Sequence, residues 1–464
     1  MVSVDIAHKQ TSKQKISKIL SLAVPAMIEN ILQTVVGFVD TLLVSRLGLT
    51  EVTAVGVANA VLAVYIAIFM AIGVGSSSLV ARSVGAGDWE QAKAIAKQST
   101  RISAMAGLFF GLITLFFAEP FLKIMGAEPK VLAVGAAYFR IVAVPSIFIS
   151  LMFIFGSLLR ASGDTKTPMK VSGWMNLIHI GLDYILIFGV FGFNGLGVAG
   201  AAWATVIVRA LGTIVLFSFI YNSKISFKDT SVNAKPYTSP ILKLSTPAAI
   251  ERLIMRLGQV LYLGLIVRIG TETYAAHTIA GNIETFSYMP GYGLAVAATT
   301  LVGQHIGAKR TKDAYSYGML TTGVAIIFMS FIGILLFFFS PWFATWFTSD
   351  KSAIDMVVTA LRIDAIAQPA LAVGLVLAGA LQGAGDTISP MYSTAIGMWM
   401  IRVVGVYILG IQFHMGIAGV WLSIAIDLFV RALFLFIRFR ARFKTSPDCC
   451  CGHNKPFSFE SSTQ

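Results

Sequence analysis

Long apolar stretches separated by short polar segments repeat along nearly the whole chain. A helix needs about 20 mostly apolar residues to cross the hydrocarbon of a bilayer. Strict alternation of apolar and polar residues, which is typical of a membrane barrel, is absent, so we predict helices. The fold class is therefore all-α, a polytopic membrane protein of twelve transmembrane helices, over residues 16–45, 52–79, 95–118, 131–158, 169–191, 196–221, 241–267, 274–301, 315–339, 354–381, 391–411 and 417–439.

Composition supports a membrane protein rather than several soluble domains. Of 464 residues, 56% are hydrophobic and only 12% are charged. Soluble domains carry about 25% charged residues. A surface this poor in charge has to be covered largely by lipid.

The positive charges divide by position. Lys and Arg gather in every second polar segment, and the intervening segments hold only Arg46, Lys123, Lys130, Arg268 and Lys351. Because basic loops stay inside, both termini are predicted to be cytoplasmic in a bacterial inner (plasma) membrane. The net charge of +13 is therefore attributed to topology, and nucleic acid is not an expected partner.

The chain repeats itself at a shift of 222 residues. Pro25 and Glu29 fall on Pro247 and Glu251, and the Gly-Asp-Thr segment at 163–165 falls on the one at 385–387. An even number of spans per repeat makes the repeats parallel, related by an axis along the membrane normal. The predicted domains are an N-terminal six-helix lobe (1–222), a cytoplasmic linker (223–240), a C-terminal six-helix lobe (241–440) and a cytoplasmic tail (441–464). Rocking of one lobe against the other is the simplest motion that they allow.

Motifs for nucleotide or hydrolytic chemistry are missing or misplaced. Gly195, Gly197 and Gly200 fit G-x-G-x-x-G, but they open an apolar span and favour close helix approach instead. No Gly-Lys dipeptide, His-Glu-x-x-His or Gly-x-Ser-x-Gly occurs. We therefore expect neither an enzyme nor a cofactor. Cys449, Cys450, Cys451 and His453 are interpreted as part of a polar tail rather than as a metal site. The two Gly-Asp-Thr segments are interpreted as turns, with Gly at positive φ and Asp capping the next segment.

Acidic residues inside the first and fifth spans are the main chemical signal. On a helix, Glu29, Gln33 and Asp40 share one face of the first span. Asn176, His179 and Asp183 share one face of the fifth. Charge in the hydrocarbon is costly, so a wet cavity is the usual reason for it. If the faces meet, Asp40 and Asp183 share a partly desolvated pocket suited to accepting H⁺ or Na⁺. A fixed interhelical hydrogen bond or ion pair is the alternative.

The second repeat breaks this pattern. Asp40 falls on Tyr262 and Asp183 on Gly405, so the coupling carboxylates are predicted in the N-terminal lobe alone. Asp427 and Arg431, one turn apart, are interpreted first as a structural pair. Glu284 is a further acidic residue within the spans. The residues predicted to contact substrate are Asp40, Gln33, Glu29, Glu251, Met255, Gln259, Tyr288 and Met289. For Met255, Tyr288 and Met289, ordinary packing is the alternative.

From Ile16 to Phe443 the chain resembles the multidrug and toxic compound extrusion (MATE) family. The stretches that carry the resemblance are 276–282, 289–293 and 300–307, together with Phe38-Val39-Asp40-Thr41. It is most similar to the DinF-like branch. The resemblance implies a V-shaped two-lobe fold and cation-coupled export of organic cations and drugs. It also implies that Asp40 and Asp183 are coupling carboxylates, with Asn176 and Thr205 as polar neighbours.

Two residues depart from the family pattern. His179 stands where Asn is expected, which disfavours sodium and favours proton coupling, with His179 as an ion-coupling residue. Tyr184 stands where Pro is expected, which removes a helix break near Asp183. If the protein uses sodium, Asp40, Asp183 and Asn176 are the predicted metal ligands.

The leading hypothesis is a secondary active multidrug exporter that exchanges small, often cationic, drug-like compounds for H⁺ or Na⁺. We expect it to act as a monomer in the lipid bilayer. A lipid-linked saccharide or lipid flippase is one alternative, although few Arg or Lys lie in the spans of the N-terminal lobe. A non-transporting membrane scaffold is the other.

Overall fold

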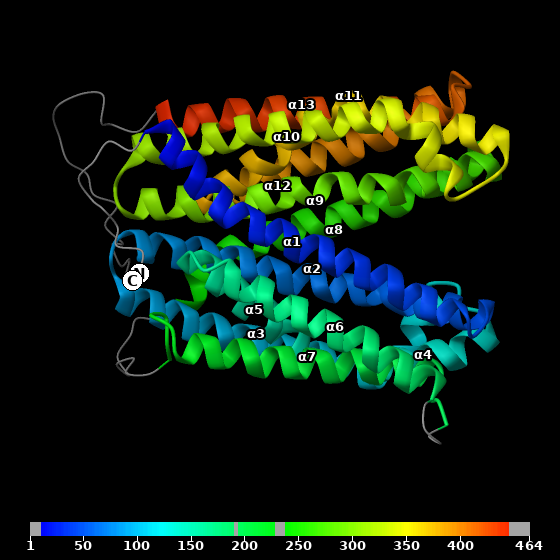
Figure 1. Ribbon diagram of the computed structural model, residues 1–464, viewed down its shortest axis with the longest axis horizontal. Coiled ribbons are helices and arrows are strands. Elements are labelled where there is room, and N and C mark those ends of the chain that lie inside the picture. Colours follow the sequence, from blue (N-terminus) through cyan, green and yellow to red (C-terminus); the bar gives the residue numbers. More distant parts are fainter. Residues whose placement is uncertain (1–10, 190–193, 228–236, 445–464) are drawn as a thin grey trace, which may run out of the picture.

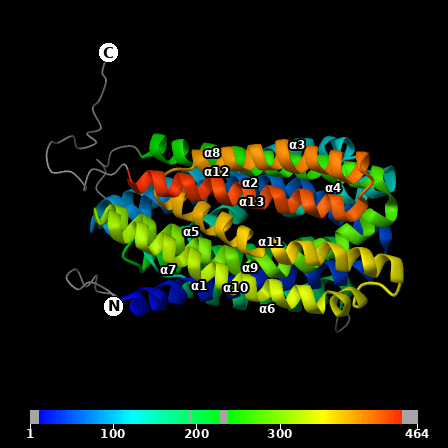
Figure 2. The same ribbon diagram turned by 90° about the horizontal axis from the view of Figure 1, so that it is seen from above.

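The computed structural model describes residues 11–189, 194–227 and 237–444, which form helices joined by short connections. No strand occurs in these ranges. The helices run along one long axis (Figures 1 and 2). They are α1 (Ser12–Ser45), α2 (Leu49–Gly85), α3 (Trp89–Ile124), α4 (Pro129–Ala143), α5 (Ser146–Ser162), α6 (Lys166–Phe188), α7 (Val198–Tyr221), α8 (Thr238–Ile269), α9 (Thr271–Gly307), α10 (Thr311–Thr345), α11 (Lys351–Gly383), α12 (Ile388–Ala395), the π-helices η1 (Ile396–Val403) and η2 (Val406–Gln412), and α13 (Gly416–Lys444).

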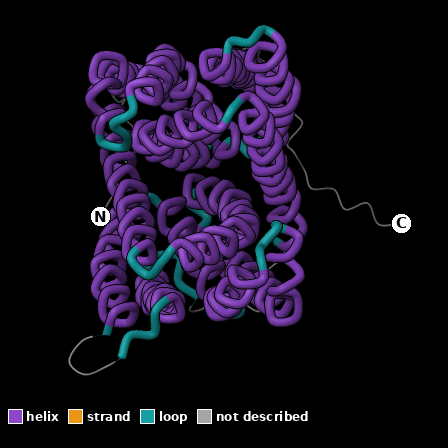
Figure 3. Tube along the Cα trace, turned by 90° about the vertical axis from the view of Figure 1, so that its right-hand side faces the viewer, coloured by secondary structure: helices purple, strands orange, loops and turns teal. Residues whose placement is uncertain are grey.

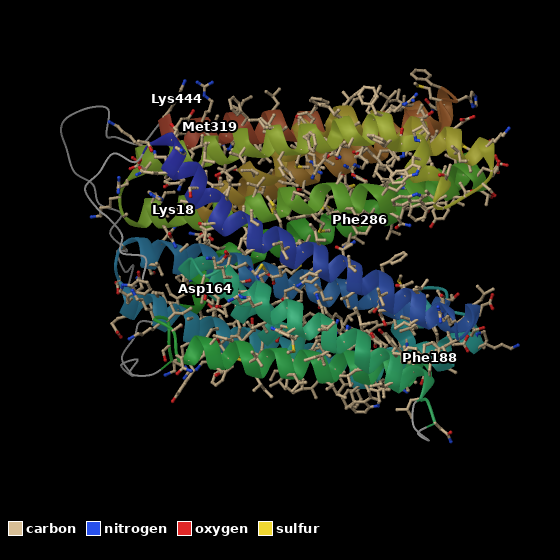
Figure 4. All side chains as sticks on the ribbon, viewed as in Figure 1. Lys18, Asp164, Phe188, Phe286, Met319 and Lys444 are labelled. Carbon is tan, nitrogen blue, oxygen red and sulfur yellow. The ribbon has the colours of Figure 1, made fainter. Side chains whose placement is uncertain are left out.

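The helices form two lobes, which Figure 3 shows as two groups seen along the axis. One end of the molecule carries the start of α1 and the end of α13, and Figure 4 places Lys18, Asp164 and Lys444 there. We call it the basic end. The opposite end, where Phe188 lies, is called the far end.

The helix boundaries repeat at the 222-residue shift. Helix α2 maps onto Thr271–Gly307, which are the bounds of α9. The bent pair α4–α5 corresponds to the single helix α11, and α6 corresponds to the mixed segment α12–η1–η2. Each repeat therefore forms the same six helical segments.

Composition alone finds fewer spans than the twelve predicted. In the described ranges nine helical segments are long and apolar enough to cross a membrane, or ten with α4–α5 taken together. Helices α8 and α9 do not meet that test although they are as long as their neighbours. Both pack against helices of the N-terminal half, α8 against α2 and α9 against α1 and α2.

The prediction of one continuous helix over 131–158 was wrong. The segment breaks between α4 and α5 with a bend of 49°. Pro145 lies at the break. Because proline lacks an N–H and its ring clashes with the preceding turn, the helix cannot continue straight through it.

Helices α1 and α8 each cross from one lobe to the other (Figure 1). The first half of α1 contributes Ile19 and Ala23 to a core built from α9, α10 and α11. Its second half packs against α6. In the same way Ile241 of α8 lies in the core of the N-terminal lobe. The start of α1 therefore packs within the C-terminal lobe, which the sequence-based division at residue 222 does not show.

The lobes meet closely at the basic end through two contacts that are equivalent under the internal repeat. A Cβ on Gly85 would collide with the backbone of Gln304, and a Cβ on Gly307 with the backbone of Arg82. Arg82 Nε donates to the carbonyl of Gly383 at 3.3 Å. Gln304 Nε2 donates to the carbonyl of Ala161 at 3.2 Å. Each contact maps onto the other under the repeat.

The two Gly-Asp-Thr turns have the predicted conformation. Gly163 and Gly385 have φ of 98° and 71°. The Asp164 carboxylate accepts from the backbone N of Thr167 at 3.0 Å, and Asp386 accepts from that of Ser389 at 2.9 Å. Both turns follow the helix ends that contact the opposite lobe, so they fix the direction of the chain at the basic end.

Candidate functional site

Two carboxylates approach each other in the N-terminal lobe, as predicted from their helix faces. Helix α1 packs against α6. Asp183 of α6 is completely buried, at 0% exposure, and Asp40 of α1 is half-buried. The two carboxylates lie within electrostatic range of each other. Asp40 Oδ1 and both Asp183 oxygens accept no hydrogen bond from the described residues.

His179 connects Asp183 to α7. Its Nε2 lies 3.2 Å from Thr205 Oγ1 and 3.6 Å from Asp183 Oδ2. Thr205 donates its one hydroxyl proton to the carbonyl of Ala201 at 3.0 Å. Because that proton is engaged, Thr205 can only accept from His179, so Nε2 carries the hydrogen. The imidazole N–H therefore points between a hydroxyl and a carboxylate.

Asn176 completes the α6 face but has no printed contact to either carboxylate. Its Nδ2 is buried and has no hydrogen-bond partner among the described residues. No group of three or more His, Cys, Asp or Glu side chains in the described ranges is arranged to hold a metal ion. The sodium set Asp40, Asp183 and Asn176, two carboxylates and an amide, stays a prediction.

The sequence interpretation gave no site role to Arg209 and Tyr138. Arg209 of α7 interacts electrostatically with Asp40 and with Tyr138 of α4, and its Nη1 is buried without an acceptor among the described residues. Arg209 follows Thr205 by one helical turn. The sequence feature that could have indicated its site role is the presence of an arginine inside an apolar span. Tyr138 also lines a surface pocket at the far end with Leu47, Glu51 and Gly197.

Glu29 is separated from this cluster. Arg160 Nη1 donates to both its oxygens at 3.0 and 3.1 Å, and Ser172 Oγ donates at 3.3 Å. Glu29 lies roughly 16 Å from Asp40 along α1, at about 1.5 Å per residue. Gln33, between them, is exposed. Glu29, Gln33 and Asp40 share one face of α1 as predicted, but they do not form one cluster.

The predicted substrate residues of the C-terminal lobe fall in different environments. Glu251 accepts from Thr394 Oγ1 at 3.1 Å, and Gln259 accepts from Arg256 Nη1 at 3.0 Å. Met255 packs against the lobe core. Tyr288 lies edge-on to Tyr292, with ring centroids 5.6 Å apart. Met289 Sδ lies 3.6 Å from Thr34 Oγ1 of α1, across the interface between the lobes.

A compact ion network fills the position of the N-terminal cluster in the C-terminal lobe. Asp427 of α13 is 0% exposed and pairs with Arg402 at 2.8 Å and with Arg431 at 3.0 Å. The structural pair predicted for Asp427 and Arg431 is thus confirmed as a contact. A Cβ on Gly397 of η1 would collide with Asp427, so this glycine makes room for the network.

Two buried polar residues of α11 were missed. Asp364 and Gln368 are 1% and 0% exposed, and Gln368 Nε2 donates to Asp364 Oδ2 at 2.7 Å and to Ser287 Oγ at 3.0 Å. Asp364 interacts electrostatically with Glu284 of α9. Their i, i+4 spacing within an apolar span was the available signal.

The fold and the buried polar residues define a polytopic membrane transporter with two repeated lobes. The MatE family model matches the chain twice, over residues 25–185 and 247–408. The chain therefore belongs to the MATE family. Its members are transporters, not enzymes.

Individual relatives agree with this assignment. The chain is 31% identical over 428 residues to the "Probable multidrug resistance protein NorM" of Thermotoga maritima, covering 91% of each chain. It is 28% identical to the "Uncharacterized transporter YisQ" of Bacillus subtilis, covering 92% of this chain and 95% of that one. A crystal structure of a MATE P26A mutant superposes with a TM-score of 0.88 at 24% identity, covering 94% and 97%. The two-lobe fold is thus shared.

Proposed function

We propose that the protein is a secondary active exporter of small organic, drug-like compounds. Export is driven by inward movement of H⁺ or Na⁺ and proceeds by alternating access between the lobes. The observation that carries this is the pair Asp40 and Asp183, because Asp40 Oδ1 and both Asp183 oxygens lack donors among the described residues. A buried carboxylate without a donor is stable only when a proton or a cation neutralises it.

The geometry favours protons over sodium as the coupling ion. Sodium, as a hard cation, is expected to favour several oxygen ligands, as calcium and magnesium do. Here the third group on the α6 face is the His179 imidazole, 3.6 Å from Asp183. An imidazole exchanges protons near neutral pH. Binding of the ion at Asp40 and Asp183 releases substrate, and loss of the ion on the other side of the membrane resets the site.

The direction of export follows from topology. The basic end, with Lys15, Arg82 and Arg310, is proposed to face the cytoplasm of a bacterium, and the far end the outside. The lobes contact each other at the basic end, which supports our proposal that this conformation is outward-facing. Ions then enter from the far end, where Tyr138 lines both the pocket and the cluster.

The domain boundaries at 222, 240 and 440 and the monomeric state stay predictions. So does the role of Cys449, Cys450, Cys451 and His453, which lie outside the described residues, as do 228–236 of the linker. The non-transporting scaffold alternative is wrong, because the chain belongs to a family of transporters. The flippase alternative stays a prediction. The name of the Thermotoga maritima relative, a probable multidrug resistance protein, supports export of drug-like compounds.

Purified protein in liposomes tests the proposal. We expect ethidium transport when a proton gradient is imposed alone, and little under a sodium gradient alone. Asp183→Asn and Asp40→Asn should each reduce it to the rate of empty liposomes, because neither amide can release a proton. Asp355→Asn, at an exposed carboxylate of α11, is the matched control. Full transport by both variants at equal reconstitution would remove these carboxylates from the mechanism.

A further inference from the structure

Helix α8 carries two arginines near its middle. Arg252 and Arg256 lie roughly 21 and 27 Å along a helix of about 48 Å, at about 1.5 Å per residue. This places both guanidinium groups at membrane depth, where a cation is kept only for a reason.

The two arginines lie on the side of α8 that faces the other lobe. On a helical wheel they share one flank with Gln259, and the opposite flank carries the exposed Ile250, Leu257 and Leu261. Arg252 Nη1 lies 3.8 Å from Met70 Sδ of α2. Helix α2 belongs to the N-terminal lobe, so the polar flank faces across the lobe interface and the apolar flank faces lipid.

Neither arginine has a salt bridge within the described ranges. Arg256 is exposed and donates only to the neutral Gln259. Arg252 interacts electrostatically with its neighbour Glu251, but that carboxylate accepts a hydrogen bond from Thr394 and also interacts with Arg431. One carboxylate thus serves two arginines, and Arg256 stays unpaired. In contrast, Arg402 and Arg431 both contact Asp427 directly.

Two tyrosines of α9 lie near this positive flank. Arg256 is within electrostatic range of Tyr288, which stacks edge-on with Tyr292. Guanidinium groups next to aromatic rings suit a flat compound that bears a carboxylate, sulfonate or phosphate.

We propose that Arg252 and Arg256 form an anion-recognition site, so that the exported compounds include aromatic anions and zwitterions. This inference rests on the proposed export function, whose substrates it narrows. The acidic group of the compound binds at α8, in the lobe opposite Asp40 and Asp183. A carboxylate ligand therefore avoids the two carboxylates that bind the coupling ion.

Equilibrium binding to the purified full-length protein in phosphatidylcholine nanodiscs tests the site without requiring transport. The probes are dansylglycine and dansylethylenediamine, which share a fluorophore but carry opposite charges. We expect Arg252→Gln/Arg256→Gln to weaken dansylglycine binding at least tenfold and to leave dansylethylenediamine within twofold. Arg252→Lys/Arg256→Lys should retain most of the anion affinity, because the charge is kept. Arg268→Gln, at the exposed end of the same helix, is the control.

Equal binding of dansylglycine by the wild type and the double Gln variant would overturn the proposal. Loss of both probes in the Gln and Lys variants alike would also overturn it, since it would indicate a structural role. A second arm adds phosphatidylglycerol to the nanodiscs. If the anionic lipid displaces dansylglycine from the wild type, the occupant is a lipid headgroup and the assignment to a free solute is wrong. Failure of ion-driven transport with intact, Arg-dependent binding would reject the export function alone.

Discussion

An arginine occupies the equivalent position in each lobe, but within the described ranges only the one in the C-terminal lobe is paired with a carboxylate. Arg431 of α13 and Arg209 of α7 correspond under the repeat, as do Asp427 and Thr205 one turn earlier. In the C-terminal lobe Asp427 pairs with Arg431 and Arg402. In the N-terminal lobe the threonine cannot pair, and Arg209 Nη1 has no acceptor among the described residues.

The helix facing each arginine differs accordingly. In the N-terminal lobe it is the regular helix α6, which presents His179 and the buried Asp183. In the C-terminal lobe the equivalent segment passes through the π-helices η1 and η2, with Gly405 at the position of Asp183. One repeat thus has a closed ion network, and the other has buried carboxylates without a paired arginine among the described residues, which we propose exchange an ion.

The largest expected effect is on stability, from Asp427→Ala. This change leaves Arg402 and Arg431 buried without their carboxylate, at a cost of about 3–5 kcal/mol. The free energy of unfolding from SDS titration measures it. Asp183→Ala, at an equally buried carboxylate without a paired arginine, should cost far less. Similar losses for both would contradict the division of roles between the lobes.

The next effect comes from copying the C-terminal pattern into the N-terminal lobe. Thr205→Asp places a carboxylate one turn before Arg209, as Asp427 lies before Arg431. Pairing of Arg209 with the new group should withdraw it from Asp40, and we expect ion-driven transport to fall about tenfold, consistent with loss of about 1.4 kcal/mol. Thr205→Asn, with the same size but no charge, is the control. The measurement is the transport rate in liposomes. Equal rates in both variants would show that Arg209 has no role in ion-driven transport.

A smaller change is expected from His179→Asn. The amide offers an oxygen to a cation but cannot exchange a proton as imidazole does. Proton-driven transport should fall severalfold, and sodium-driven transport should rise relative to it. Asn176→Ala, on the same face of α6, serves for comparison. An unchanged ratio of the two rates would indicate that His179 only holds Thr205 and Asp183 in place.

The smallest effect on transport is expected from Glu29→Gln. Glutamine keeps one hydrogen-bond acceptor for Arg160 but loses the charge, so the protein should lose about 1.5 kcal/mol of stability. Transport by the folded fraction should be nearly unchanged, since Glu29 lies apart from the carboxylate pair. Measurement of both quantities on one preparation separates them. A loss of transport as large as that of Asp40→Asn would place Glu29 in the coupling site.

Much of this arrangement followed from periodicity and the internal repeat. Helical spacing placed Asp40 and Asp183 on faces that meet, and the repeat anticipated the matching bounds of α2 and α9. Periodicity identifies which face of a helix is apolar, but not which lobe buries it. The crossing of α1 and α8 was therefore not predicted. The link from Arg209 to Tyr138 was missed for the same reason, because it joins helices far apart in the chain.

Local strain also escaped the sequence interpretation. The bend at Pro145 was hidden within one long apolar run, although proline was the available warning. The π-helical segment 396–412 has no comparable signal. Its equivalent α6 is regular, and the π-helix η1 carries Arg402 and Gly397, which pack around Asp427.

The reciprocal contact at the basic end has an evolutionary consequence. Gly85 touches Gln304, and Gly307 touches Arg82, which are equivalent pairs. In a two-fold symmetric dimer, each subunit offers one and the same patch to its partner, which is an isologous interface. Two copies of a half-length ancestor would have met in this way. Joining them in one chain then freed the arginine surroundings in each half to diverge, while the glycines kept the shared contact.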